Sequence, residues 1–299
     1  MSGISDEALS GLSEFGLLAE NAKQAGVSGP LPSVERTEAG PISALRWGGP
    51  DPRAVFLHGI GQNAHTWDTV IVGLGVSALA LDLPGHGHSA WREDGDYSPE
   101  KNADALIPVL LGLAPHAELV VGMSLGGLTG IRIGALEPSL VDELVLIDIT
   151  PAALQRHAEM TNDQRGTVGL MTGPREFPSF EAMLEMTRLA APNRDPESLR
   201  RGVFHNSRQL DNGNWAWRYD TIRTIPDFAA LWRDVDTLPA PVTLVRGAVS
   251  GYVTDGDAEE LADRAPQFLR QHVVDNAGHS VQSDQPRALI SIIREIIDR

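Results

Sequence analysis

The sequence predicts an α/β fold in which a mostly parallel, doubly wound sheet carries an inserted helical lid. Three features of the chain predict it: short apolar runs without alternation, helical segments between these runs, and a long middle segment that lacks them. Unbroken apolar runs are typical of strands that are buried on both faces of a parallel sheet, and parallel strands need crossover helices. We therefore expect an N-terminal helical extension, a core in two pieces and a lid between them, with the bounds 1–33, 34–150 with 236–299, and 151–235.

The expected elements can be placed in chain order. Residues 1 to about 30 have apolar side chains near helical spacing and are followed by glycines and prolines, so one amphipathic helix is expected. Turn residues then separate two short strands of a hairpin within 34–47. The predicted strands of the parallel sheet are 54–59, 78–85, 118–124, 143–151, 242–247 and 270–279. The predicted helices are 101–113, 125–136, 255–265 and 285–297 in the core, and 180–190 and 197–207 in the lid.

The composition excludes several classes of function. The chain has 299 residues, with 24 Lys and Arg against 40 Asp and Glu, and its net charge of −16 opposes binding to nucleic acids and to anionic membranes. The absence of cysteine excludes disulfides, thiolate metal sites and cysteine nucleophiles. We find no secretory signal and no run of about 18 apolar residues, so a cytoplasmic protein with a small-molecule substrate is expected. The lid alone is neutral, with 11 Arg and 11 acidic residues, so its composition admits an anionic substrate.

The strongest chemical signal is the sequence GMSLGG at 122–127, which follows an expected strand and opens an expected helix. Such a sharp turn holds its central residue in strained backbone geometry, and small neighbours let the two backbone segments pass closely. Ser124 is therefore expected at the carboxyl edge of the sheet as a nucleophile. The backbone N–H of Leu125, at the start of the helix, can face a developing oxyanion.

Two further loops follow predicted strands. The loop HGIGQN at 58–63 can bring a second backbone N–H, that of Ile60, opposite Leu125 to complete an oxyanion hole. The loop DLPGHGHS at 82–89 holds two histidines without a third ligand at a suitable spacing, so we interpret it as a structured turn. We expect neither a metal site nor a cofactor.

These three loops and a late AGHS at 277–280 occur in an order that resembles the α/β-hydrolase fold superfamily, in its serine-nucleophile branch. The resemblance covers the chain from about residue 34 onward and implies a catalytic triad in the order serine, acid, histidine, with His279 as the base. The acid usually follows strand 242–247 at a position that is Ser250 here. Members that resemble haloalkane dehalogenases carry it one strand earlier, which corresponds to Asp148.

Three carboxylates compete for the role of the acid. Asp148 ends an apolar strand where the lid begins, so it can be buried beside the imidazole. Asp255 and Asp257 remain alternatives, although the polar stretch around them is typical of a helix N-terminus. The geometric argument favours Asp148.

A serine at the turn indicates acyl transfer to water. We expect a cofactor-independent serine hydrolase that cleaves a carboxylic ester or a lactone of a small molecule through an acyl-enzyme. Two alternatives remain open: a carbon–carbon bond hydrolase of ring-cleavage diketone acids, and a hydrolase-like small-molecule receptor with little turnover.

A lid over the nucleophile normally supplies much of the pocket wall. The candidate substrate-binding residues are Gly59, Trp67, Met123, Phe204, Trp215 and Trp217. The competing interpretation is that the lid aromatics form only the lid's own core. Arg188 and Arg194 are candidates to clamp a substrate carboxylate, or else pair with neighbouring acids. The N-terminal helix is expected either to cover the core or to mediate a homodimer.

Overall fold

The computed structural model of the protein describes residues 11–192, 194–224 and 227–299. Its centre is an eight-stranded sheet with the strand order β1-β2-β4-β3-β5-β6-β10-β11. β1 (Val34–Ala39) and β2 (Ile42–Trp47) form the expected hairpin, and β2 runs antiparallel to β4. The parallel strands are β3 (Ala54–Leu57), β4 (Ala78–Leu81), β5 (Leu119–Met123), β6 (Leu144–Ile147), β10 (Val242–Gly247) and β11 (Phe268–Val274). The mostly parallel sheet that the apolar runs predicted is confirmed.

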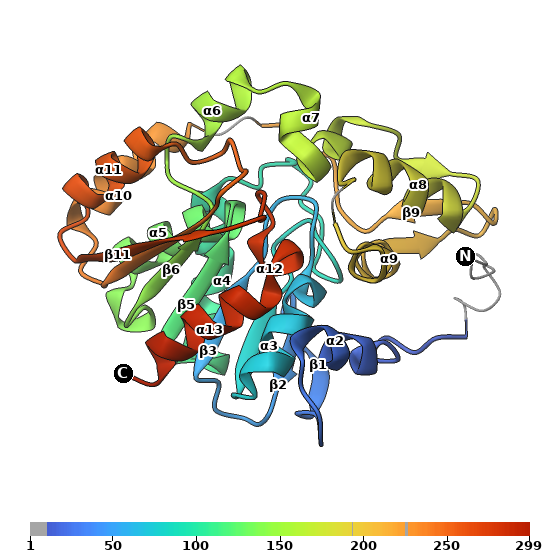
Figure 1. Ribbon diagram of the computed structural model, residues 1–299, viewed down its shortest axis with the longest axis horizontal. Coiled ribbons are helices and arrows are strands. Elements are labelled where there is room, and N and C mark those ends of the chain that lie inside the picture. Colours follow the sequence, from blue (N-terminus) through green and yellow to red (C-terminus); the bar gives the residue numbers. More distant parts are fainter. Residues whose placement is uncertain (1–10, 193, 225–226) are drawn as a thin grey trace.

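Helices cover both faces of this sheet, as a doubly wound fold requires (Figure 1). Along β3, Val55 and Leu57 join one core while Phe56 joins the other, because successive residues of a strand point to opposite faces. The helices over the first core are α4 (Pro99–Leu113), α5 (Leu125–Leu136), α10 (Leu231–Thr237) and α11 (Asp255–Arg264). Those over the second are α2 (Leu18–Ala25), α3 (Asp68–Leu74) and α13 (Pro286–Ile297). The short connecting elements are η1 (Ala64–Trp67), η2 (Pro138–Leu140) and α12 (Val281–Asp284).

The N-terminal segment differs from the prediction of a single helix over residues 1 to about 30. Residues 1–10 lie outside the described ranges, and in the part that follows only α2 is helical. A turn closed by the Gly16 N–H on the Ser13 carbonyl precedes α2, and Gly26 ends the helix in a left-handed conformation (φ 76°). α2 packs against α3 and α13, where Arg287 donates a hydrogen bond to the Gln24 carbonyl at 2.8 Å. The segment therefore covers the core, which is one of the two roles expected of it.

The insert, residues 151–235, was predicted to be helical, but it contains strands as well as helices. Two of its helices match the prediction, but three strands pair antiparallel in the order β7-β9-β8. Strands of two or three residues are too short to show alternation in the sequence, so the pattern missed them. The elements of the insert before α10 are α6 (Ala153–Glu159), α7 (Asn162–Arg165), η3 (Gly166–Thr172), β7 (Glu176–Phe177), α8 (Phe180–Ala190), α9 (Pro196–His205), β8 (Ser207–Gln209), β9 (Trp215–Trp217) and η4 (Phe228–Ala230).

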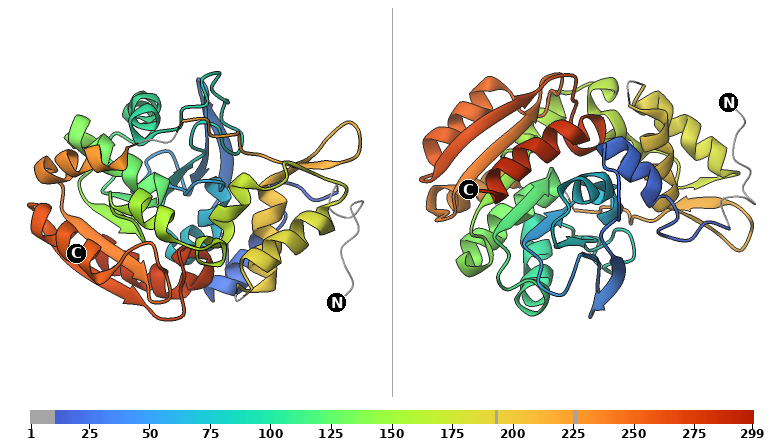
Figure 2. Two further views of the ribbon diagram at one scale, coloured as in Figure 1. Left: turned by 90° about the horizontal axis from the view of Figure 1, so that it is seen from above. Right: turned by 60° about the horizontal axis from the view of Figure 1, so that its bottom comes forward.

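The insert has a hydrophobic core of its own, which is distinct from the two cores of the sheet. Its buried members are Phe177, Phe180, Met183, Leu199, Val203, Trp215, Trp217 and Tyr219. The last part of the insert belongs to a core of the sheet instead, because α10 packs against α5 and contributes Leu231 and Val235 to that core. Figure 2 shows α2 lying next to the helices of the insert, where Arg200 binds Glu20 at 2.6 Å. In the described ranges, no helix is long and apolar enough to cross a membrane.

Candidate active site

Ser124 lies between β5 and α5 in strained backbone geometry, with φ 52° and ψ −120°. The glycines around it are required by space: a Cβ on Gly122 would lie 2.5 Å from the Gly126 carbonyl oxygen. A Cβ on Gly126 would lie 2.3 Å from the carbonyl oxygen of Leu57 in β3. The strand-to-helix turn therefore forms as the glycine pattern predicts, and it presents Ser124 at the carboxyl edge of the sheet.

The close contact between Gly126 and the Leu57 carbonyl predicts a loss of stability when a side chain is added. Gly126→Ala is expected to lower the free energy of unfolding by about 1–3 kcal/mol, because the added methyl overlaps a backbone carbonyl that cannot move cheaply. Gly112→Ala in α4 is the matched control, since no atom lies within 4 Å of its added Cβ. The control variant is expected to leave the free energy of unfolding unchanged or to raise it by about 0.5–1 kcal/mol, because alanine has a higher helix propensity than glycine. Urea unfolding of both variants measures this, and equal effects would contradict the argument.

His279 lies in the loop after β11 and contacts the carboxylate of Asp148. Its Nδ1 lies 2.8 Å from Asp148 Oδ2, and Asp148 is fully buried at the end of β6. The Asp148 backbone has φ 52°, the same strained region as Ser124. Its other oxygen, Oδ1, accepts a hydrogen bond from the Gly247 N–H at 3.0 Å. A carboxylate held in this way fixes the orientation and the tautomer of the imidazole.

Ser250 occupies the position where the superfamily usually carries the acid. Its hydroxyl donates a short hydrogen bond to Oδ2 of Asp148, the oxygen that faces His279. Ser250 is itself held by the Tyr252 N–H, which donates to Ser250 Oγ at 3.2 Å. Ser250, at the usual position of the acid, thus donates a hydrogen bond to Asp148, the carboxylate that lies one strand earlier. Sequence reasoning noted this position but did not foresee the contact.

The two alternative acids lie in other environments. The side chain of Asp255 is 88% exposed and pairs with Arg246 at 2.7 Å. Asp257 caps α11, accepting the Thr254 N–H at 2.9 Å, and it also pairs with Arg156 at 3.1 Å. Neither carboxylate contacts His279 in the described structure. Their place at a helix N-terminus is the one that the polar stretch predicted.

The ring of Tyr252 stacks on the face of the His279 imidazole. The rings of Tyr252 and His279 are 3.7 Å apart between centroids and 18° from parallel. Burial raises the pKa of Tyr252, so its hydroxyl stays protonated, and His157 Nδ1 lies 3.3 Å from that hydroxyl. His279 Nε2 is buried and has no hydrogen-bond partner among the described residues, and no hydrogen bond joins it to Ser124. The sequence carried no signal for Tyr252.

The two expected oxyanion donors are free to bind a ligand. Among the described residues, neither the Ile60 N–H nor the Leu125 N–H donates a hydrogen bond. The loop that carries Ile60 is fixed by His58, whose Nδ1–H donates to the Gly59 carbonyl at 2.7 Å and whose Nε2 accepts the Leu83 N–H at 2.9 Å.

A second histidine supports the same loop. His86 Nε2 accepts the Gly61 N–H at 3.1 Å, while its Nδ1–H donates to the Pro84 carbonyl. Both imidazoles accept as well as donate, so both are neutral. Burial lowers the pKa of His58 to about 4 and that of His86 to about 3, which agrees with this hydrogen bonding. The turn 82–89 is therefore structured and supports the oxyanion loop.

A cavity opens between this loop and the insert. Its wall includes Ile60 and Gly61 of the loop and Trp217 of the insert, but neither Ser124 nor His279. The contacts of the triad, rather than this cavity, locate the chemistry, because the cavity wall contains Ile60 but no member of the triad. Further residues of the wall are Leu170, Met171, Asn206 and Tyr219.

The other candidate substrate-binding residues are distributed differently. Trp67 is fully buried in the sheet core, with its ring centroid 5.2 Å from that of Phe56, and it is not among the residues of the wall of this cavity. Met123 is also buried in that core. Phe204 and Trp215 border a separate hollow, and Trp215 and Trp217 belong to the core of the insert as well.

The two arginines considered for a substrate carboxylate already have acidic partners. Arg188 is exposed and pairs with Glu185 at 2.8 Å. Arg194 pairs with Asp284 at 2.9 Å. Arg188 follows the competing interpretation, in which an arginine on a helix pairs with a neighbouring acid. Arg194 lies outside a helix, and its partner Asp284 in α12 is distant in the sequence.

Comparison with known proteins identifies the family of the chain. A model of the alpha/beta hydrolase family matches residues 54–292. The chain is 70% identical over 295 residues to the esterase Rv0045c of Mycobacterium tuberculosis (strain ATCC 25618 / H37Rv), and the match covers 99% of each chain. It is 27% identical over 259 residues to the lipase LipV of the same organism, covering 85% of this chain and 96% of the lipase.

Solved structures give the same result. A structure of the M. tuberculosis esterase Rv0045c, described together with its inhibition by transition metals, matches with a TM-score of 0.90 at 71% identity. That match covers 97% of this chain and 100% of the other. The family model spans most of the chain and the relatives extend over nearly all of it. The chain belongs to the α/β hydrolase family.

Proposed function

We propose that the protein hydrolyses a carboxylic ester or a lactone of a small molecule, with Ser124 as nucleophile, His279 as base and Asp148 as acid. The observation that carries the proposal is the buried Asp148–His279 pair, at 2.8 Å, at the same sheet edge as the Ser124 turn. Since Nδ1 of His279 is bound to Asp148, Nε2 is the nitrogen that remains to take a proton. This arrangement supports acyl transfer to water.

The reaction divides into two steps. The Ser124 hydroxyl attacks the ester carbonyl carbon while its proton passes to His279 Nε2, and the N–H groups of Ile60 and Leu125 bind the resulting oxyanion. His279 then returns the proton to the leaving alcohol as the carbon–oxygen bond breaks. In the second step water attacks the acyl carbon while His279 takes its proton. His279 returns that proton to the Ser124 oxygen as the acyl–oxygen bond breaks and the acid is released. Asp148 stabilises the imidazolium in both steps.

The relatives support the ester class. The esterase at 70% identity and the lipase at 27% identity are both named as ester hydrolases. Arg194 lines the cavity, but Asp284 already balances its charge, and Arg188 is not among the residues of the cavity wall. This counts against a substrate with a second carboxylate, such as a diketone acid. We also assign residues 151–235 the role of a lid, since this insert forms one wall of the cavity beside the oxyanion loop.

A substrate panel tests the reaction class. Purified protein is offered short p-nitrophenyl esters, lactones and ring-cleavage diketone acids, and product is followed by absorbance and chromatography. Turnover of esters or lactones, with none of the diketone acids, is expected. Turnover confined to the diketone acids would assign the protein to carbon–carbon hydrolysis. Tight binding of a lactone without steady-state product would assign it to the receptors instead.

A further inference from the structure

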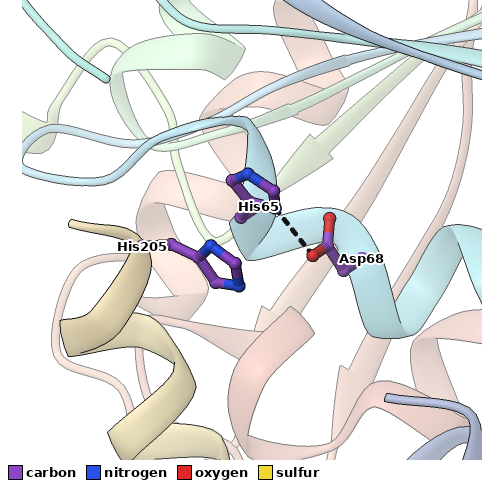
Figure 3. Close-up of side chains that lie close together, drawn as sticks. All are labelled: His65, Asp68 and His205. Atoms are coloured by element: carbon purple, nitrogen blue, oxygen red, sulfur yellow. Dashed lines mark hydrogen bonds and ion pairs between the residues drawn. The ribbon is translucent and has the colours of Figure 1, made fainter. Parts of the chain in front are cut away.

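A second cluster of polar side chains lies between the core and the insert, outside the triad. Figure 3 shows its three members: His65 from η1, Asp68 from the start of α3, and His205 from the end of α9. Each residue offers one ligand atom, and these atoms all lie within 4.8 Å of one another. All three residues line the cavity beside the oxyanion loop. The sequence did not reveal the cluster, because His205 lies 137 positions after Asp68.

Two atoms of the cluster are buried without a partner. His205 is 9% exposed, and its Nε2 makes no hydrogen bond within the described residues. Asp68 is 2% exposed, and its Oδ1 is likewise without a partner in that part of the chain. Buried polar atoms normally have partners, so two such atoms beside one cavity point to a ligand that binds both.

We propose that His65, Asp68 and His205 bind a divalent transition-metal ion of the zinc class. Two imidazoles and a carboxylate are ligands that zinc prefers, and water from the adjoining cavity can fill a fourth position. In this arrangement His65 binds through Nδ1, His205 through Nε2 and Asp68 through its carboxylate.

The surroundings fit such an ion. Glu14 Oε1 lies 3.1 Å from His65 Nε2, so with Nδ1 on the ion the opposite ring N–H donates to a carboxylate, which is the usual support for a metal-binding histidine. Asp68 is also held by Asn21, whose amide donates to Oδ2 at 3.3 Å. The nearby cation Arg36 pairs with both Glu14 and Asp82, the latter at 2.9 Å. The three carboxylates Glu14, Asp68 and Asp82 stand against this one guanidinium, so with neutral imidazoles a net charge of −2 remains to balance a dication.

Binding requires one ring to turn. His65 and His205 now stack with centroids 3.7 Å apart and 11° between planes, and two parallel rings cannot both point a lone pair at one ion. Ligands at the ~2.1 Å zinc distance lie roughly 3.4 Å apart around a tetrahedral ion. His65 Nδ1 and Asp68 Oδ2 are joined by a hydrogen bond of 2.8 Å, so the ion must displace the proton between them. The widest pair of ligand atoms lies within 4.8 Å and must approach the tetrahedral spacing. The bound ion would join the core, the insert and, through Glu14, the N-terminal segment.

The test measures binding directly on the full chain without a histidine tag, after removal of metal with a chelator. Titration with Zn²⁺ by calorimetry is expected to give one tight site, and Co²⁺ is expected to give the visible absorption of a four-coordinate ion. His205→Gln and Asp68→Asn are each expected to abolish both signals. Glu14→Gln is expected to weaken binding by about 10- to 100-fold, because it changes only the outer partner. His272→Gln on β11 is the matched control and is expected to bind as the wild type does.

The outcomes that overturn the site are equally definite. Tight binding that survives in both His205→Gln and Asp68→Asn would exclude it. Loss of binding in His279→Gln with retention in His205→Gln would place the ion at the triad instead. Circular dichroism establishes that each variant is folded. If His205→Gln does not fold, Asp68→Asn and Glu14→Gln decide the question by the same titrations.

Discussion

Ser124→Ala is expected to lower kcat for ester hydrolysis by about a million-fold, the loss seen when a serine protease loses its nucleophile. The reason is that no other hydroxyl occupies the turn between β5 and α5, where the Leu125 N–H can bind the oxyanion. Alanine has the same Cβ as serine, so the strained φ of 52° costs the variant no more than the wild type. Steady-state hydrolysis of a p-nitrophenyl ester, corrected for the reaction without enzyme, measures the effect.

The control for this variant is a serine far from the site. Ser139 lies in η2, where its hydroxyl donates to Glu137 at 2.6 Å on the surface. Ser139→Ala is expected to retain the wild-type rate, and both variants are expected to unfold at the wild-type temperature. A folded Ser124→Ala variant that retains the rate would assign the nucleophile to another residue.

Asp148→Asn is expected to lower kcat by roughly 10³- to 10⁴-fold with little change in KM. Both oxygens of Asp148 accept hydrogen bonds, from His279 and Ser250 on one and from Gly247 on the other. An asparagine has only one acceptor oxygen, so its amide NH₂ must face either the imidazole or the Gly247 N–H. The imidazole then takes the wrong tautomer, or the loop after β10 loses a buried hydrogen bond.

Asp257→Asn is the matched control for the acid. Asp257 is also a buried carboxylate, 4% exposed, and it also accepts a backbone N–H, that of Thr254 at 2.9 Å. Its loss is expected to cost about 0.5–2 kcal/mol of stability through the cap of α11, with kcat near the wild-type value. Comparison of kcat, KM and urea unfolding for the two variants separates an orienting carboxylate from a structural one. A strong loss of kcat in Asp257→Asn alone would transfer the role of the acid to that residue.

The sheet and the Ser124 turn could be predicted because their signals are local. An unbroken apolar run such as 143–151 reflects a strand buried on both faces, wherever the rest of the chain lies. The glycine spacing at 122–127 lies within one strand-turn-helix unit, although the carbonyl of Leu57 in β3 also limits Gly126. The prediction failed where the local signal was weak. The strands β7, β8 and β9 are too short for a pattern, and in the described residues α2 begins only after the turn at Ser13 and Gly16.

The wall of the cavity could be predicted only in part. Aromatic residues in a lid can serve its own core or a substrate pocket, and nothing in their spacing separates the two. Trp217 does both in the structure, whereas Trp67 packs on Phe56 inside the sheet core. Which face of an element meets a cavity depends on the packing of several elements at once, and one sequence pattern does not contain that information.

The parallel sheet, the Ser124 turn, the place of His279 after the last strand and the short set of candidate acids all followed from the order of the residues. Only the tertiary structure brought Asp148 against His279 and added the Ser250 hydroxyl, because these groups come from three neighbouring strands of the sheet, β6, β10 and β11. It also brought His205 of the insert onto His65 and Asp68 of the core. Local patterns follow from the period of a helix or a strand, whereas contacts between distant residues follow from strand order and from how the elements pack.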